Sequence, residues 1–434
     1  MRFNSRFAIL ALLLLFGGGT QQFTRAQGLG KFDRDSAEAM LDAARDDLKK
    51  NYYDPTLRGI DIETKFKDAK ERVRQATSRD QLIITVAQTL LDFDDSHTFF
   101  VPPSRAAKVE YGWEMQMVGE AAFVTGVKPK TDAEAKGLKP GDQIVSVDGY
   151  APTRENMWKM YYRYYALMPA RGMRLMVRSP DQAEPREVEV LAKIERGANV
   201  VDWGDVFIRF LRERRDVGKD RAVEFGNELL IWEMTTFSTS EDHIDAMMGR
   251  ASKFKSLLID LRGNGGGYTD ALSRLTSYFF DRDVKIADQK GRKETKPLLA
   301  KTRGGVYKGQ VIVLIDSESA SASELFARTL QLEKRGAVLG DRSMGAVMTS
   351  RYYDHQTGVG QVLHFGNSIT VGDLIMPDGK SLEKTGVAPD ETLLPTGADL
   401  AAKRDPVLAR AAEMLGVKLD AEKAGTLFPK EWRN

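Results

Sequence analysis

The sequence contains no cysteine and only four histidines among 434 residues. The absence of cysteine excludes disulfide bonds, a catalytic thiolate and a lipid-modified N-terminal cysteine. Lysine and arginine number 64 and aspartate and glutamate 62, so the net charge is only +2. No basic block with interleaved aromatic residues is present. There is therefore no electrostatic case for binding nucleic acid or an anionic membrane surface.

Long hydrophobic runs are equally scarce, and the one at the N-terminus is short. Arg2 and Arg6 precede an apolar run from Phe7 to Phe16, and "TRA" follows before Gln27. A membrane-spanning helix needs about 20 apolar residues. The pattern therefore predicts a signal peptide over residues 1–26 and no stable membrane anchor. We expect an exported protein, periplasmic or extracellular, that is stabilised by its cores because it has no disulfides.

The first half of the remaining chain contains two regions of different character. Residues 31–105 show the apolar spacing of helices and predict an N-terminal helical region. In residues 107–195, short apolar runs are divided by Gly, Pro and Asp, which predicts a small, mostly β module. One helix is expected inside this module, over "TRENMWKMYYRYY".

The second half is dominated by alternating strands and helices. Residues 196–226 are highly charged and predict a linker or an edge hairpin. In residues 227–400, apolar strands alternate with amphipathic helices, which predicts an α/β domain with a parallel sheet. Residues 401–434 predict a C-terminal helical tail around "DPVLARAAEML".

A cluster of serines follows one of the predicted strands. The stretch "IDSESASASELFART", residues 315–329, lies between the apolar run "VIVLI" and an amphipathic helix. A hydroxyl at such a helix start lies beside unpaired backbone N–H groups and partial positive charge, which favour an oxyanion. Ser321 and Glu324 also form the S-x-x-E pattern of a capping box, so a purely structural interpretation stays open.

A glycine-rich stretch follows another predicted strand. "LLIDLRGNGGGYTDAL" has glycine at positions 263 and 265–267 before a helix. It is not a phosphate-binding loop, because no Lys-Ser/Thr pair follows and a dinucleotide motif would need glycine at Tyr268. The stretch is either a plain turn or a place where the backbone approaches a reacting atom closely.

In this order, "SLLIDLRGNGGG", "VIVLIDSESASASELFA", "AVLGDRSMGA" and "LEKTGVAPDE" resemble the carboxy-terminal processing, or tail-specific, serine proteases. "GLKPGDQIVSVDG" resembles their PDZ domain, and the helices around "NYYDP" resemble their N-terminal region. The resemblance implies a crotonase-like α/β catalytic core of ββα repeats with an inserted PDZ domain. It also implies a protein or peptide substrate bound by its C-terminus, and neither a metal nor an organic cofactor.

The resemblance also assigns roles to individual residues. Ser321, the middle serine of S-A-S-A-S-E, matches the nucleophile of the family. The oxyanion donors implied are the backbone N–H of Ala322 and one from the glycine stretch, with Gly267 preferred to Gly266. In the PDZ-like module, the predicted substrate-binding loop is "YGWEM", with Gly112, Trp113, Glu114 and Met115 as candidate residues.

The chain departs from the family pattern at the catalytic base. Ala346 stands where most members have a lysine, and a methyl group cannot accept a proton. His97, in "DFDDSHTFF", resembles the histidine of the tricorn branch, which pairs serine with histidine and a carboxylate, and Glu383 matches that carboxylate. A structural role is expected for His243, His355 and His364. The same acidic stretch lacks the glycine of a calcium loop.

The sequence thus predicts an exported serine endopeptidase with a Ser321–His97–Glu383 triad. Two other classes stay open because of Ala346 and because the substrate is not identified. One is a catalytically inactive relative that binds peptides as an adaptor. The other is an esterase that uses the same triad.

Overall fold

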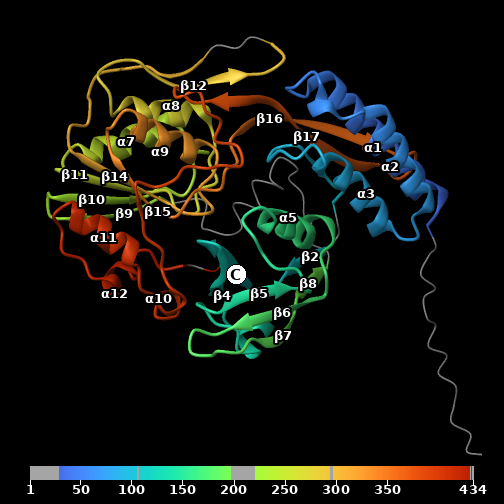
Figure 1. Ribbon diagram of the computed structural model, residues 1–434, viewed down its shortest axis with the longest axis horizontal. Coiled ribbons are helices and arrows are strands. Elements are labelled where there is room, and N and C mark those ends of the chain that lie inside the picture. Colours follow the sequence, from blue (N-terminus) through green and yellow to red (C-terminus); the bar gives the residue numbers. More distant parts are fainter. Residues whose placement is uncertain (1–28, 105–106, 197–219, 294–296, 431, 433–434) are drawn as a thin grey trace, which may run out of the picture.

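The computed structural model describes residues 29–104, 107–196, 220–293, 297–430 and 432 (Figure 1). The predicted signal peptide lies outside the described residues, and so does most of the predicted linker. Among the described residues, none of the helices combines the length and the apolar character that crossing a bilayer requires.

A six-stranded sheet forms the centre of the second half of the chain (Figure 1). Its strands run in the order β18-β15-β14-β11-β10-β9. All neighbouring pairs from β10 to β18 are parallel, as the sequence predicts, whereas β9 pairs antiparallel with β10 at the edge. The bounds are β9 Arg221–Phe225, β10 Leu229–Glu233, β11 Ser256–Asp260, β14 Gln310–Ile315, β15 Ala337–Gly340 and β18 Glu391–Thr392.

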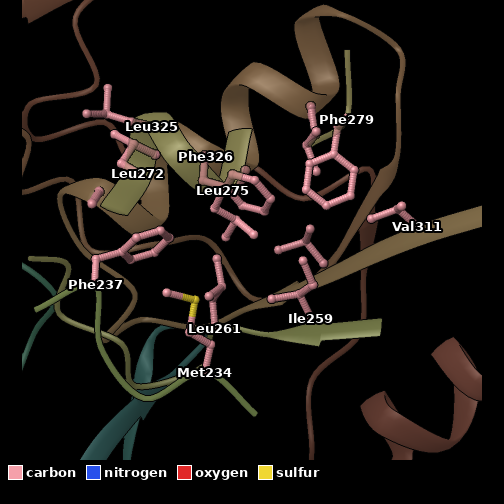
Figure 2. Close-up of a cluster of buried hydrophobic side chains, with 14 of the residues drawn as sticks. Met234, Phe237, Ile259, Leu261, Leu272, Leu275, Phe279, Val311, Leu325 and Phe326 are labelled. Atoms are coloured by element: carbon pink, nitrogen blue, oxygen red, sulfur yellow. The ribbon is translucent and has the colours of Figure 1, made fainter. Parts of the chain in front are cut away.

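Helices cover both faces of this sheet, and its central strands β10, β11 and β14 are apolar on both sides. One core, part of which is shown in Figure 2, joins the sheet to α7, α8 and α9, and contains Ile259, Leu275 and Phe326. The alternate strand residues, such as Leu258 and Leu314, pack against α11 and α12. The bounds are α7 Glu241–Ala251, α8 Thr269–Ser277, α9 Ala322–Leu332, α10 Gly397–Ala401, α11 Pro406–Met414 and α12 Ala421–Ala424.

A second, antiparallel sheet joins the N-terminal helices to the rest of the molecule. Its order is β1-β17-β12-β13, and β16 also pairs with β17. β1 begins two residues after His97 and pairs with β17, with Phe99 opposite Ser368. The pairing of β1 with β17 positions Ser96 and His97 relative to the second half of the chain. The bounds are α1 Lys31–Asn51, α2 Ile62–Gln75, α3 Arg79–Leu91, β1 Phe99–Val101, β12 Val284–Lys290, β13 Leu298–Ala300, β16 Met348–Thr357 and β17 Leu363–Ile375.

Residues 107–196 form a separate, mostly β unit, which we call the small domain. Its main sheet has the order β3-β4-β5-β6-β7, so β3 lies at an edge. The helix expected over residues 153–165 begins later than predicted, at Met157. Its α-helical part, α5, ends at Tyr161, and a wider π-turn continues to Leu167. The bounds are β2 Ala107–Glu110, β3 Trp113–Val118, β4 Ala121–Val127, α4 Asp132–Ala135, β5 Gln143–Val147, α5 Met157–Tyr161, β6 Gly172–Arg178, β7 Arg186–Leu191 and β8 Lys193–Arg196.

Candidate active site

Ser321 lies at the junction between the turn after β14 and the first residue of α9. Its backbone has φ 56° and ψ −116°, a conformation that L-residues other than glycine rarely adopt. In this conformation the Ser321 hydroxyl makes no side-chain cap hydrogen bond to α9. A strained residue between a strand and a helix is the backbone arrangement of nucleophile turns in hydrolases.

Glu324 holds this strained turn from within α9. Its fully buried carboxylate accepts from the Ser321 N–H at 2.9 Å and the Ala346 N–H at 3.0 Å through one oxygen. The other oxygen accepts from the Gly345 N–H at 2.8 Å and the Ser343 hydroxyl at 2.6 Å. Burial raises the pKa of Glu324 to about 7, although all four donors favour its ionised form. The capping partner predicted from the sequence therefore also positions Ser321.

The glycine stretch passes directly beside Ser321. A Cβ added to Gly266 would lie 2.8 Å from the Cβ of Ser321, and one added to Gly267 would lie 2.2 Å from the carbonyl carbon of Phe237. Only glycine fits at these two positions. Within the described residues, the amides of Gly267 and Ala322 have no hydrogen-bond acceptor, whereas the Gly266 N–H donates to Asn264 Oδ1 at 2.9 Å. The two preferred oxyanion donors are thus available for a ligand.

His97, Ser96 and Glu383 form a continuous hydrogen-bonded chain. The Ser96 hydroxyl lies 2.6 Å from His97 Nδ1 and donates to Glu383 Oε2 at 2.8 Å. The Ser96 N–H donates to the other oxygen of Glu383, also at 2.8 Å. The sequence predicted that Glu383 would reach the imidazole, and the structure places the Ser96 hydroxyl between the two groups. Ser96 was missed because the "SH" pair was interpreted through its histidine alone.

The direction of these hydrogen bonds fixes the form of the imidazole. An ionised carboxylate can only accept, so the single proton of the Ser96 hydroxyl points to Glu383. His97 Nδ1 must then carry the proton that it donates to Ser96, and Nε2 keeps its lone pair. Burial lowers the pKa of His97 to about 4, with nearby Asp95 acting in the opposite direction. His97 is partly buried, and its lowered pKa favours the neutral base.

Both parts of the candidate site attach to one backbone segment, Ala346–Val347. The Ser321 N–H donates to the Ala346 carbonyl at 3.1 Å. The Val347 N–H donates to Glu383 Oε2 at 2.9 Å. Burial raises the pKa of Glu383, while the donors from Val347 and Ser96 act in the opposite direction. Two consecutive residues thus connect the serine turn to the carboxylate behind the histidine.

The predicted peptide-binding loop of the small domain is mostly enclosed. Gly112 has φ +73°, as a turn there requires, but the side chains of Trp113 and Met115 are buried in the domain's own core. The hydroxyl of Tyr161 accepts from the Met115 N–H at 3.2 Å and donates to the Met115 carbonyl at 2.6 Å. Glu114 pairs with Lys430 from the C-terminal segment. In this conformation an added peptide strand would have to displace Tyr161 from the edge of β3.

Two of the other histidines and the acidic stretch have local partners. His243 Nε2 lies 2.8 Å from Asp220, and His355 Nε2 lies 2.7 Å from Asp47. Asp95 accepts from the Tyr52 hydroxyl and from the backbone N–H groups of residues 97 and 98. Asp95 therefore holds the turn that carries His97.

Part of this chain is similar to a known peptidase family. Residues 229–393 match peptidase family S41. The match contains Ser321, the glycine stretch and Glu383, whereas His97 lies outside it. Because this match lies on the six-stranded sheet, we use "S41 domain" from here on only as a label for the part of the chain built on that sheet.

Individual relatives extend the similarity beyond the S41 domain. The carboxy-terminal processing protease CtpB of Bacillus subtilis (strain 168) is 26% identical over 289 residues, or 64% of this chain and 54% of its own. CtpA of the same organism is 22% identical over 387 residues, or 87% of this chain and 73% of its own. The chain therefore spans only about half the length of CtpB.

Among solved structures, mature CPAF aligns with a TM-score of 0.64 at 15% identity, covering 85% of this chain and 94% of its own. The photosystem II D1 C-terminal processing protease aligns with a TM-score of 0.50 at 19% identity, covering 91% and 100%. At such low identities these likenesses support a shared α/β fold only.

Proposed function

We propose that this chain is a serine endopeptidase that cleaves peptide bonds through Ser321, His97 and Glu383, with Ser96 as a relay. The observation that carries the proposal is the chain of hydrogen bonds from Glu383 through Ser96 to His97, attached to the same two residues as the Ser321 turn. A plain helix cap would need neither this relay nor the strained backbone at Ser321.

In the first half of the reaction, Ser321 Oγ attacks the carbonyl carbon of the scissile peptide bond. His97 Nε2 takes the proton of the hydroxyl, and the Ser96–Glu383 pair stabilises the imidazolium that forms. The negative oxygen of the tetrahedral intermediate accepts from the N–H groups of Ala322 and Gly267. The carbon–nitrogen bond then breaks as the imidazolium returns its proton to the leaving amine.

In the second half, water attacks the acyl carbon bound to Ser321. His97 Nε2 takes one proton from that water, and the intermediate again places its oxygen against the two amides. Collapse of the intermediate releases the carboxylic acid and returns the proton to the Ser321 oxygen. Every proton transfer passes through Nε2, which is the nitrogen left unprotonated by the Ser96 hydrogen bond.

The substitution of the family's lysine by Ala346 is compatible with this mechanism. Ala346 is buried and supplies only its backbone, through its N–H to Glu324 and its carbonyl to Ser321. The backbone of Ala346 thus holds the Ser321 turn, while the proposed base, His97, comes from the N-terminal region.

We also propose a crotonase-like core for the S41 domain and a PDZ-like role for the small domain. In that role the loop Tyr111–Met115 receives the C-terminal tail of a protein, including poorly folded ones. A peptide with a free apolar C-terminus should then bind better than its amidated form by about 1–3 kcal/mol, the scale of charge-assisted hydrogen bonds. Calorimetry with both peptides tests this role, and equal affinities would contradict it. Export to the periplasm or beyond stays part of the proposal, resting on residues 1–26.

The direct test of the proposed chemistry is labelling of the purified protein with a fluorophosphonate, which reacts with activated serines. We expect label on Ser321 in the wild type and none in Ser321→Ala. His97→Ala should lose most of the labelling while keeping a folded far-UV circular dichroism spectrum. Unchanged labelling of His97→Ala would show that another group activates the serine.

One observation favours a second function. Ala346 removes the base that most of the family uses, so an inactive adaptor that binds peptides through the small domain is the alternative. It predicts peptide binding in the calorimetric experiment but no label on Ser321. An esterase would react with the fluorophosphonate at Ser321 but leave casein intact, so a casein cleavage assay distinguishes it from the peptidase.

A further inference from the structure

The two proposed oxyanion donors come from different parts of the S41 domain. Gly267 lies in the loop after β11, and Ala322 lies at the start of α9, after the turn that follows β14. Oxyanion stabilisation requires donors fixed about 3 Å from one oxygen atom. Something must therefore hold the glycine loop and the serine turn in a fixed relation.

The side chain of Asp316 connects these two segments. Its Oδ1 accepts from the Gly263 N–H at 2.8 Å, at the start of the glycine loop. The same oxygen accepts from the N–H groups of Glu318 at 3.0 Å and Ser319 at 3.1 Å, within the serine turn. Asp316 is almost fully buried, so these donors replace water around its carboxylate.

The hydroxyl of Ser319 adds a second link between the same segments. It accepts from the Asp316 N–H at 3.0 Å and donates to the carbonyl of Leu261 at 2.8 Å. Asp316 and Ser319 thus bind the end of β11 to the turn that leads into Ser321.

The remaining oxygen of Asp316 is bound from outside the S41 domain. Gln116, on strand β3 of the small domain, donates from Nε2 to Asp316 Oδ2 at 2.6 Å. The neighbouring Ser317 hydroxyl donates to the carbonyl of Met117 at 2.6 Å. The edge strand of the small domain therefore completes the hydrogen bonds of Asp316, which joins the two halves of the site together with the Asn264 carbonyl, the acceptor for the Ala320 N–H and the Ser323 hydroxyl.

We propose that Asp316 is a positioning residue for the Ser321 site, and that Gln116 makes this positioning depend on the docked small domain. The proposal rests on the proposed peptidase function. It requires a side-chain acceptor at position 316 rather than a negative charge. Asparagine can keep Oδ1 as the acceptor, and its amide can donate to Gln116 if the Gln116 amide rotates to present its oxygen.

The experiment uses the full-length chain and two readouts, the rate of fluorophosphonate labelling and hydrogen exchange of residues 261–268 and 317–323. Asp316→Ala should label about 100-fold more slowly, the usual cost of misplacing a catalytic group by about 1 Å. Gln116→Ala should label about tenfold more slowly, because it removes one hydrogen bond to a charged group. Both variants should exchange faster in both segments, and Asp316→Ala should exchange faster than Gln116→Ala.

Two further variants separate positioning from general damage. Asp316→Asn should label within about threefold of wild type. Its side-chain oxygen can still accept from the N–H groups of Gly263, Glu318 and Ser319, which hold the two segments together. Glu120→Gln should match wild type; its exposed side chain lies at the same interface and pairs with Arg154 and Arg342.

The proposal is overturned if Asp316→Ala labels at the wild-type rate, or if Asp316→Asn is as slow as Asp316→Ala. If Asp316→Ala fails to fold, Gln116→Ala decides, and unchanged labelling and exchange in that variant contradict the role of the small domain. If the wild type does not label, the peptidase function fails, while hydrogen exchange still tests the positioning by Asp316.

Discussion

Replacing Ser96 by alanine tests the relay behind His97. The change removes the hydroxyl that accepts from His97 Nδ1 and donates to Glu383 Oε2. Glu383 keeps its hydrogen bonds from the backbone N–H groups of Ser96 and Val347, so the carboxylate should stay in place. The variant therefore isolates the connection between the carboxylate and the imidazole.

The size of the effect follows from the hydrogen bond that is lost. A hydrogen bond to a group that becomes charged contributes about 1.5–3 kcal/mol. If that interaction acts on the imidazolium formed in the transition state, kcat/KM should fall about 10- to 150-fold. The free energy of unfolding should fall by no more than about 1–2 kcal/mol, because partly exposed His97 can bind water at Nδ1.

Ser368→Ala is the matched control for this variant. The Ser368 hydroxyl donates to the backbone carbonyl of His97 at 2.6 Å but does not bind the imidazole relay. We expect a loss of stability of about 1 kcal/mol and a change in kcat/KM of less than about threefold. Cleavage of casein and urea unfolding measure the two quantities. A twofold or smaller loss of activity in Ser96→Ala, or an equal loss in Ser368→Ala, would refute the relay.

Three further predictions concern protonation and strain. Because the pKa of His97 is lowered and the neutral form is the base, kcat/KM should persist on acidification and fall only well below pH 6.5; a midpoint at or above 6.5 in a pH profile would contradict this. The pKa of Glu324 is raised from 4.5 to about 7, so the folded state holds a proton that the unfolded state releases, and stability from this group is lost as pH rises through that window. Urea unfolding at pH 5 and pH 8 should show that Glu324→Gln lacks roughly 2–3 kcal/mol of this decrease, and equal pH slopes for variant and wild type would argue against it. Finally, Ser321→Gly should be about 1 kcal/mol more stable than Ser321→Ala in thermal unfolding, since the φ of 56° suits glycine, and an equal or lower stability would speak against strain at this residue.

The architecture of the S41 domain follows closely from its sequence. The central strands β10, β11 and β14 have apolar residues on both faces because both faces are covered, and the helices show one apolar face each. Leu257, Leu258 and Ile259 of β11, for example, alternate between the core of α7–α9 and the core of α11–α12. The serine turn and the glycine stretch could be located because a strand, a turn and a helix have distinct local signals.

Hydrogen bonds between residues that are far apart in the sequence could not be predicted from local sequence patterns. Ser96 and Glu383 are 287 residues apart, so their hydrogen bond depends on how β1 adds to β17. The strained backbone of Ser321 is held by Glu324 and Ala346, and a capping box predicts an ordinary extended residue there instead. Asp316 gave no signal because its function is to bind backbone groups of another segment.

In the proposed mechanism Ser321 and His97 act as one catalytic unit, with Ala346 at the position where the sequence resemblance places a lysine. The most direct measurement is the rate of casein cleavage by Ser321→Ala, His97→Ala and the double variant, each confirmed to be folded. Because members of one unit lose activity together, the double variant should be no slower than either single variant. A double variant whose losses add, or full activity in His97→Ala, would contradict the claim.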